Sequence, residues 1–194
     1  MELLVSMGLM MLLMGSILAI FQSGARYYNN STKIVDLQQA CLVSANRIGG
    51  ELSVADLSCI DDTSTTKTYL TFASPINDQG DVTFSEGTTS MLWIKYICYY
   101  IEKSNGQETL RRQTSLILPA ADAPPTVPTG LDDAYFRSLV PPTPTTPYPS
   151  SLIASNIYSL DATRSATGLS LVVTARDSFH EFRISVETTI QPRN

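Results

Sequence analysis

The chain has 194 residues, with 13 lysine and arginine residues against 18 aspartate and glutamate residues, and a formal net charge of −5. This acidic balance argues against a nucleic-acid partner, because neutralising phosphates over a broad surface requires clustered lysine and arginine side chains. Arg111 and Arg112 are the only adjacent basic pair, so any basic patch would be small. The length allows one domain of about 140 residues behind an N-terminal anchor.

The chain opens with an apolar run that follows a single acidic residue. Residues 3–21 carry no charge, and Glu2 precedes them. As a helix rising about 1.5 Å per residue, this run spans about 28 Å, close to the bilayer's hydrocarbon thickness of about 30 Å. We therefore expect residues 1–22 to be a transmembrane helix. The alternatives are a generic signal anchor and a cleaved secretory signal. A cleaved signal usually has a shorter apolar core of about 7–15 residues.

A second helical pattern follows directly and predicts an amphipathic continuation over residues 23–54. Apolar side chains recur at steps of three and four, which places them on one helix face. They are Ile34, Leu37, Cys41, Leu42, Ala45, Ile48 and Leu52. The opposite face is expected to hold Asp36, Gln39, Ser44, Asn46 and Arg47.

The rest, residues 55–194, reads as a β-rich head. Turn residues separate six β-branched or aromatic stretches, and Asn105 with Gly106 forms the clearest hairpin turn. The six predicted strands cover residues 67–73, 91–102, 108–118, 152–160, 169–175 and 179–190. One long helix followed by six strands predicts an α+β fold, with the helix packed on one face of an antiparallel sheet.

A proline-rich insertion over residues 119–150 interrupts the strands. It holds nine of the eleven prolines, which favour extended or turn structure on a surface. Residues 131–140 are expected to form a short helix with Tyr135, Phe136 and Leu139 on one face. The insertion either contacts a partner or covers an edge of the sheet with its aromatic side chains.

The chemistry-bearing residues form no recognisable catalytic or metal-binding motif. The three cysteines lack metal-ligand spacing. We expect Cys41 to be a core residue and Cys59 to pair with Cys98 in an oxidising compartment, which would stabilise the fold by about 2–4 kcal/mol. The only histidine, His180, is interpreted as a strand residue at a turn. We therefore expect no enzyme, cofactor or metal site.

The N-terminus resembles that of type IV pilins and pseudopilins, in which a glutamate stands ahead of a purely apolar helix. The matching residues are ELLVSMGL at 2–9 and LAIFQS at 18–23. The hairpin YICYYIE at 96–102 with TLRR at 109–112, and the ending ETTIQPRN at 187–194, are similar to the W-type minor pilins and the J-type pseudopilins.

The resemblance implies a pilin-like fold and a structural subunit that assembles into a filament, in a priming or tip position. Glu2, Leu3, Leu4 and Val5 would form the assembly surface, with Glu2 pairing with the terminal amine of a neighbouring subunit. The implied partners are other pilin subunits, inner-membrane lipid before assembly, and a prepilin peptidase that removes an upstream leader. The alternative is a single-span protein that does not polymerise and presents a β-rich binding or adhesin domain.

Overall fold

The computed structural model describes residues 2–61, 68–87, 89–123, 125, 131, 133–138, 150–165, 168–177 and 182–191. The chain divides into two compact units, Met1–Asp36 and Leu37–Asn194. Helix α1 covers Glu2–Leu52, so its residues 37–52 belong to the second unit. The predicted α+β fold is confirmed, since a long apolar N-terminal helix is combined with antiparallel sheets. The second unit begins inside α1, ahead of the boundary predicted at residue 55.

The first sheet is antiparallel and has the strand order β1-β2-β3-β4-β5. The predicted hairpin forms β3 and β4, and its turn residues Asn105 and Gly106 have φ values of 52° and 78°. Positive φ at both positions suits the two-residue turns that match the twist of the flanking strands. The strands are β1 (Ile60–Asp61), β2 (Tyr69–Ser74), β3 (Trp93–Ser104), β4 (Gln107–Ala121) and β5 (Ser151–Ser155).

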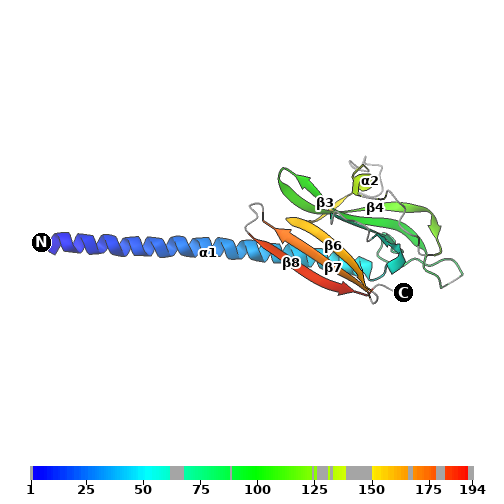
Figure 1. Ribbon diagram of the computed structural model, residues 1–194, viewed down its shortest axis with the longest axis horizontal. Helices are drawn as coiled ribbons and strands as arrows, with labels where there is room; N and C mark the ends of the chain where they lie inside the picture. The colour runs from blue at the N-terminus through cyan, green and yellow to red at the C-terminus, as the bar shows by residue number, and fades with distance from the viewer. Residues whose placement is uncertain are drawn as a thin grey trace. The chain divides into compact units, whose positions relative to one another are not determined.

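A second, separate sheet contains β6 (Ile157–Ser165), β7 (Gly168–Arg176) and β8 (Arg183–Ile190), which lie side by side in Figure 1. The prediction of a single strand over residues 152–160 is therefore wrong. Asn156 breaks it with a φ of 65°, a left-handed conformation that asparagine tolerates better than most residues. Its backbone N–H donates to the carbonyl of Glu108 at 2.6 Å, and its own carbonyl accepts from the N–H of Arg176 at 2.9 Å.

Both sheets cover residues 37–52 of α1. The Sγ of Cys41 lies 3.6 Å from the carbonyl oxygens of Val173 in β7 and Ile184 in β8, while Glu51 is bonded to Tyr99 in β3. Cys41 is fully buried, as predicted. The buried residues of α1 are Leu37, Cys41, Ser44, Ala45, Ile48 and Leu52.

The predicted apolar face of α1 needs two corrections. Leu42 is 51% exposed, whereas Ser44 is fully buried and donates from Oγ to the carbonyl of Ala40 at 2.7 Å. At 3.6 residues per turn, Leu42 lies about 100° around the helix from Cys41, outside the buried arc. Ser44 lies three residues from Cys41 and so falls within that arc.

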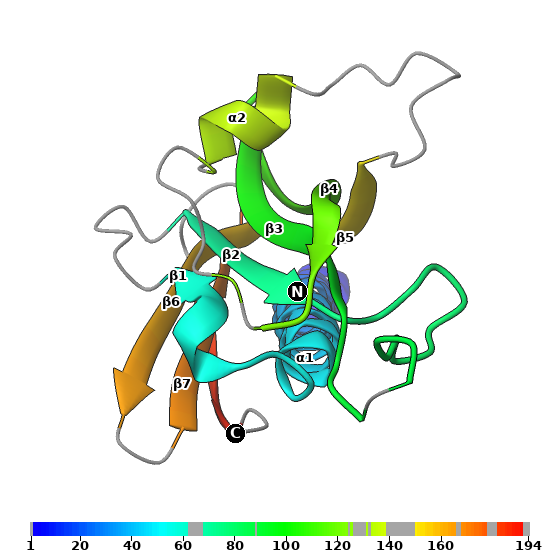
Figure 2. The same ribbon diagram turned by 90° about the vertical axis from the view of Figure 1, so that its right-hand side faces the viewer.

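The predicted short helix is present as α2 (Asp133–Ser138), and Figure 2 shows it across β3 from the end of α1. Tyr99 and Tyr100 are adjacent on β3 and point to opposite faces. Tyr99 bonds to α1, whereas the guanidinium carbon of Arg137 in α2 lies 5.3 Å from the ring centroid of Tyr100. Phe136 is fully buried. The part of the insertion that forms α2 thus covers a face of the sheet. Leu139 lies outside the described residues.

Candidate functional site

The first part of α1 holds the predicted assembly residues. Glu2, Leu3, Leu4 and Val5 form its first turn, and all four are exposed. The large apolar side chains from position 3 to position 21 are between 54% and 77% exposed. By length and composition, α1 could cross a membrane. So dense an apolar surface is unfavourable in water, and lipid or other protein would have to cover it.

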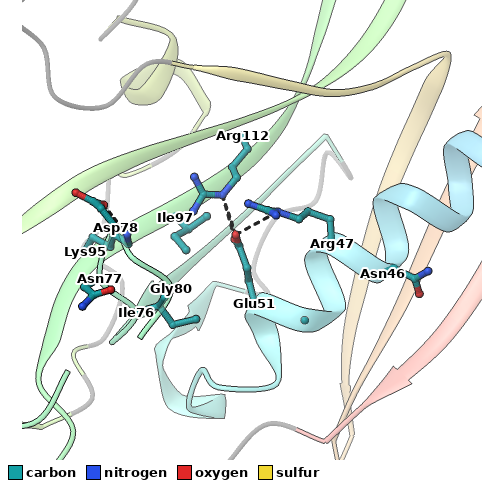
Figure 3. A pocket seen from close by; sticks show the side chains of 11 residues that line it. Asn46, Arg47, Glu51, Ile76, Asn77, Asp78, Gly80, Lys95, Ile97 and Arg112 are labelled. Carbon is teal, nitrogen blue, oxygen red and sulfur yellow. Dashed lines mark hydrogen bonds and ion pairs between the residues drawn. The ribbon is translucent and has the colours of Figure 1, made fainter. Parts of the chain in front are cut away.

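A cluster around Glu51 fastens the end of α1 to the first sheet, as Figure 3 shows. The Nε of Arg112 donates to both carboxylate oxygens of Glu51, at 3.0 and 3.1 Å, and the hydroxyl of Tyr99 donates to Oε2 at 2.8 Å. Arg47, one turn earlier on α1, lies 3.5 Å from Oε1. Burial, followed by the adjacent Glu51 carboxylate, raises the pKa of Tyr99, so its hydroxyl stays a proton donor at neutral pH.

Beside this cluster lies a polar cleft of about 500 Å³, bounded by α1, the loop after β2, and strands β3 and β4. The Nζ of Lys95 lies 3.0 Å from Oδ1 of Asp78 in that loop. The Oδ1 of Asn77 holds the loop in shape by accepting from the backbone N–H groups of Gln79 and Asp81, both at 2.9 Å. The lining residues are Asn46, Arg47, Gly50, Glu51, Ile76, Asn77, Asp78, Gly80, Lys95, Ile97 and Arg112.

The cleft is slightly cationic although the chain as a whole is acidic. Its lining includes the cations Arg47, Lys95 and Arg112 and the carboxylates Glu51 and Asp78, whereas the whole chain has a net charge of −5. A local excess of positive charge in a concave site favours an anionic ligand over a cationic one. The arrangement can therefore bind an acid, but it presents no nucleophile with an adjacent base among the described lining residues.

A second charged cluster joins the two sheets. Glu108, at the start of β4, is only 8% exposed and receives two hydrogen bonds from Arg176 of β7, at 2.7 and 2.9 Å. Lys103 lies 3.2 Å from the same carboxylate. Burial by itself raises the pKa of Glu108, but the bonds and charges of Arg176 and Lys103 outweigh it and hold the pKa below its ordinary value. The guanidinium carbon of Arg176 also lies 3.8 Å from the ring centroid of Tyr158.

The predicted disulfide is not formed. Cys59 and Cys98 are both fully buried thiols in the structure. The Sγ of Cys59 donates to the carbonyl of Asp56 at 2.9 Å, and burial raises its pKa to about 11. Cys98 is paired in register with Thr71, whose hydroxyl donates to the carbonyl of Leu131 on the α2 side of the sheet.

The other residues considered for chemistry give no site. His180 lies outside the described residues. Within the described part of the chain, no group of three or more histidine, cysteine, aspartate or glutamate residues is placed to hold a metal ion.

Sequence reasoning did not find the polar cleft, although one signal pointed towards it. Lys95 interrupts the otherwise apolar run MLWIKYICYY at 91–100, and a charge inside a buried strand needs a partner. The adjacent pair Arg111 and Arg112 makes no basic patch, because the two side chains leave opposite faces of β4. Arg111 bonds to Glu102, whereas Arg112 bonds to Glu51.

The comparisons with known proteins give no match to a family model, to a curated protein or to a solved structure.

Proposed function

We propose that the protein is a structural subunit that assembles through the first part of α1 into a type IV pilus-like filament. The observation that carries the proposal is the uncharged run of residues 3–21, whose large apolar side chains are all exposed, with one carboxylate, Glu2, at its start. Such a helix is stable only when lipid or other apolar helices surround it. A carboxylate at its edge gains from a positive partner on a neighbouring subunit.

In this proposal, the subunit first lies in the bacterial inner membrane as a single-pass protein with its head outside the cytoplasm. A prepilin peptidase would process it, and other pilin subunits would then replace lipid around the helix in a periplasmic or cell-surface filament. The similarity to W-type minor pilins and J-type pseudopilins favours a priming or tip position. The head, fastened to α1 through Glu51, would be displayed on the outside of the filament.

A second candidate function is a single-span anchor that does not polymerise and presents the head as a binding module. The cleft of about 500 Å³ beside Glu51 favours it, because clefts of about 300–1,000 Å³ are the usual size for small ligands. The two functions differ in what they require of Glu2: a plain anchor works equally well with glutamine at that position.

The experiment that separates them introduces Glu2→Gln into the native gene. Surface filaments are counted by electron microscopy, and the subunit is followed by membrane fractionation. Asp36→Asn is the matched control, because it removes one exposed carboxylate from α1 outside the apolar run. Loss of filaments with Glu2→Gln alone, with the variant still in the membrane fraction, supports assembly through Glu2. Filament counts that stay at the wild-type level in Glu2→Gln and in a deletion strain would leave the tethered binding module.

A further inference from the structure

The cleft beside Glu51 contains cationic N–H donors that the described residues do not use. Arg112 bonds to Glu51 through Nε alone, and its two terminal nitrogens make no hydrogen bond within the described part of the chain. The ammonium of Lys95 makes one such bond, to Asp78. A guanidinium carries five N–H donors and an ammonium carries three. About four N–H groups of Arg112 and about two of Lys95 therefore remain for a ligand.

The burial of Lys95 makes its incomplete pairing notable. Only 6% of its side chain is exposed, whereas the side chain of its partner Asp78 is 74% exposed. A charge removed from water is costly unless its hydrogen bonds are satisfied. Because Asp78 is well solvated, it can move away from Lys95 or share it with an incoming anion at little cost.

The two cations lie at opposite ends of an apolar floor. Arg112 is paired in register with Tyr99, and Lys95 lies four residues earlier on β3, about 13 Å along the strand. Ile97, which is 1% exposed, lies between them on the same face of β3 and lines the cleft, as Figure 3 shows. Both cationic side chains are long enough to reach towards each other over Ile97.

We propose that this cleft binds a ligand with two carboxylates joined by a short apolar link. One carboxylate accepts hydrogen bonds from the terminal nitrogens of Arg112, because a guanidinium can donate two parallel N–H bonds to the two oxygens of a carboxylate in a bidentate pair. The other bonds to the ammonium of Lys95, and the link lies over Ile97. The cleft's volume, about 500 Å³, accommodates such a ligand. The inference is independent of filament assembly, because every residue in it belongs to the second unit, Leu37–Asn194.

Two sources share this chemistry: a small organic dicarboxylate, and two acidic side chains on one polypeptide segment. The test uses the full chain, ¹⁵N-labelled and held in detergent micelles. Succinate is one probe, and a glutamate dipeptide with both ends blocked is the other. Acetate at the same ionic strength is the single-carboxylate comparison. The readout is the change in NMR chemical shift of the backbone amides when the probe is added. Gly50 and Gly80 line the cleft and report binding, whereas Gly168 does not line it and serves as the reference.

The decisive variant is Lys95→Met, which removes the ammonium but keeps the buried hydrocarbon length, and leaves only the solvated Asp78 unpaired. Lys103→Met is its matched control: it removes the same charge from the same strand, and Glu108 keeps Arg176 as a partner. We expect the chemical shifts of Gly50 and Gly80 to change saturably as the probe is added. The dissociation constant of the probe should rise at least tenfold in Lys95→Met and change less than twofold in Lys103→Met.

Acetate should bind at least tenfold more weakly than succinate. Saturation by succinate alone indicates a small acid, and tighter binding of the dipeptide indicates a polypeptide; both support the proposal. The proposal is overturned if neither probe shifts the cleft amides, if Lys95→Met binds as wild type does, or if Lys103→Met loses binding equally. Equal binding of acetate and succinate would also overturn it, because the second carboxylate would then contribute nothing.

Discussion

Replacing Glu51 by glutamine tests whether the cluster at the end of α1 holds the helix to the sheet. The substitution keeps the shape of the side chain but removes its charge. Glu51 accepts hydrogen bonds from Arg112 and from the fully buried Tyr99, and its own side chain is only 13% exposed. An amide has a single acceptor oxygen, so it can satisfy only part of this set, and its NH₂ group would face the guanidinium.

The expected cost follows from the bonds that are lost. Hydrogen bonds to charged groups contribute about 1.5–3 kcal/mol each, and leaving a buried donor unsatisfied costs about 1–3 kcal/mol. With one acceptor retained, we expect Glu51→Gln to lower the free energy of unfolding by about 2–4 kcal/mol. In a domain of 150–250 residues, that corresponds to a fall in Tm of about 5–15 °C.

The measurement is urea unfolding of the full chain in detergent micelles, followed by the fluorescence of Trp93. This is the only tryptophan and it is 1% exposed, so its emission reports loss of the core. Glu102→Gln is the matched control, because Glu102 bonds to Arg111 on the other face of the same hairpin and both side chains are about one-third exposed. It should cost less than about 1 kcal/mol. The reasoning would be refuted if both variants lowered the free energy of unfolding by similar amounts, or if Glu51→Gln lowered it by less than about 1 kcal/mol.

Two further predictions concern the other buried groups. Glu108→Gln should lower the free energy of unfolding at about pH 7, where the carboxylate of Glu108 is charged and paired. As the pH falls, the unfolded wild-type chain takes up a proton on Glu108 near the ordinary pKa of 4.5, whereas the folded chain does so only at its lowered pKa. The difference in free energy of unfolding between wild type and variant should therefore shrink as the pH falls through that lowered pKa. Urea unfolding at about pH 7 and about pH 3 measures this, and a difference that does not change with pH would contradict it. Because Cys59 is buried and its pKa is raised to about 11, the native chain should react slowly with an aromatic disulfide reagent, and the unfolded chain should show three thiols. A single thiol in the unfolded chain would instead indicate a disulfide between two of the three cysteines.

Local patterns were sufficient for the elements whose structure depends on neighbours in the chain. The apolar run of residues 3–21 predicts a long helix because every residue in it is apolar or uncharged. The hairpin of β3 and β4 was predictable because Asn105 and Gly106 readily take positive φ between two strand-forming stretches. The helix α2 was expected within residues 131–140, but Tyr135 and Phe136 do not share one face as predicted: Tyr135 is 37% exposed, whereas Phe136 is fully buried, because adjacent residues lie about 100° apart around a helix.

The division into two sheets depended on tertiary contacts. Residues 152–160 have the composition of one strand, and Asn156, although it tolerates a left-handed backbone, is too weak a local signal to divide them between two sheets. Its left-handed backbone joins β5 to β6, and its amide and carbonyl bond to Glu108 and Arg176, which come from different sheets. Which face of α1 is buried was decided in the same way, since two sheets cover an arc that includes Ser44 and leaves out Leu42.

The sequence by itself therefore determined the apolar helix, the acid at its start and the β-rich class of the head. The charged clusters were decided only by the tertiary structure. Glu51 and Arg112 are 61 residues apart in the chain, and Glu108 and Arg176 are 68 apart. Periodicity reports which side of an element is apolar, but it carries no information on which distant charge will lie opposite. The cleft between Lys95 and Arg112 exists because strand register and helix packing bring those side chains together.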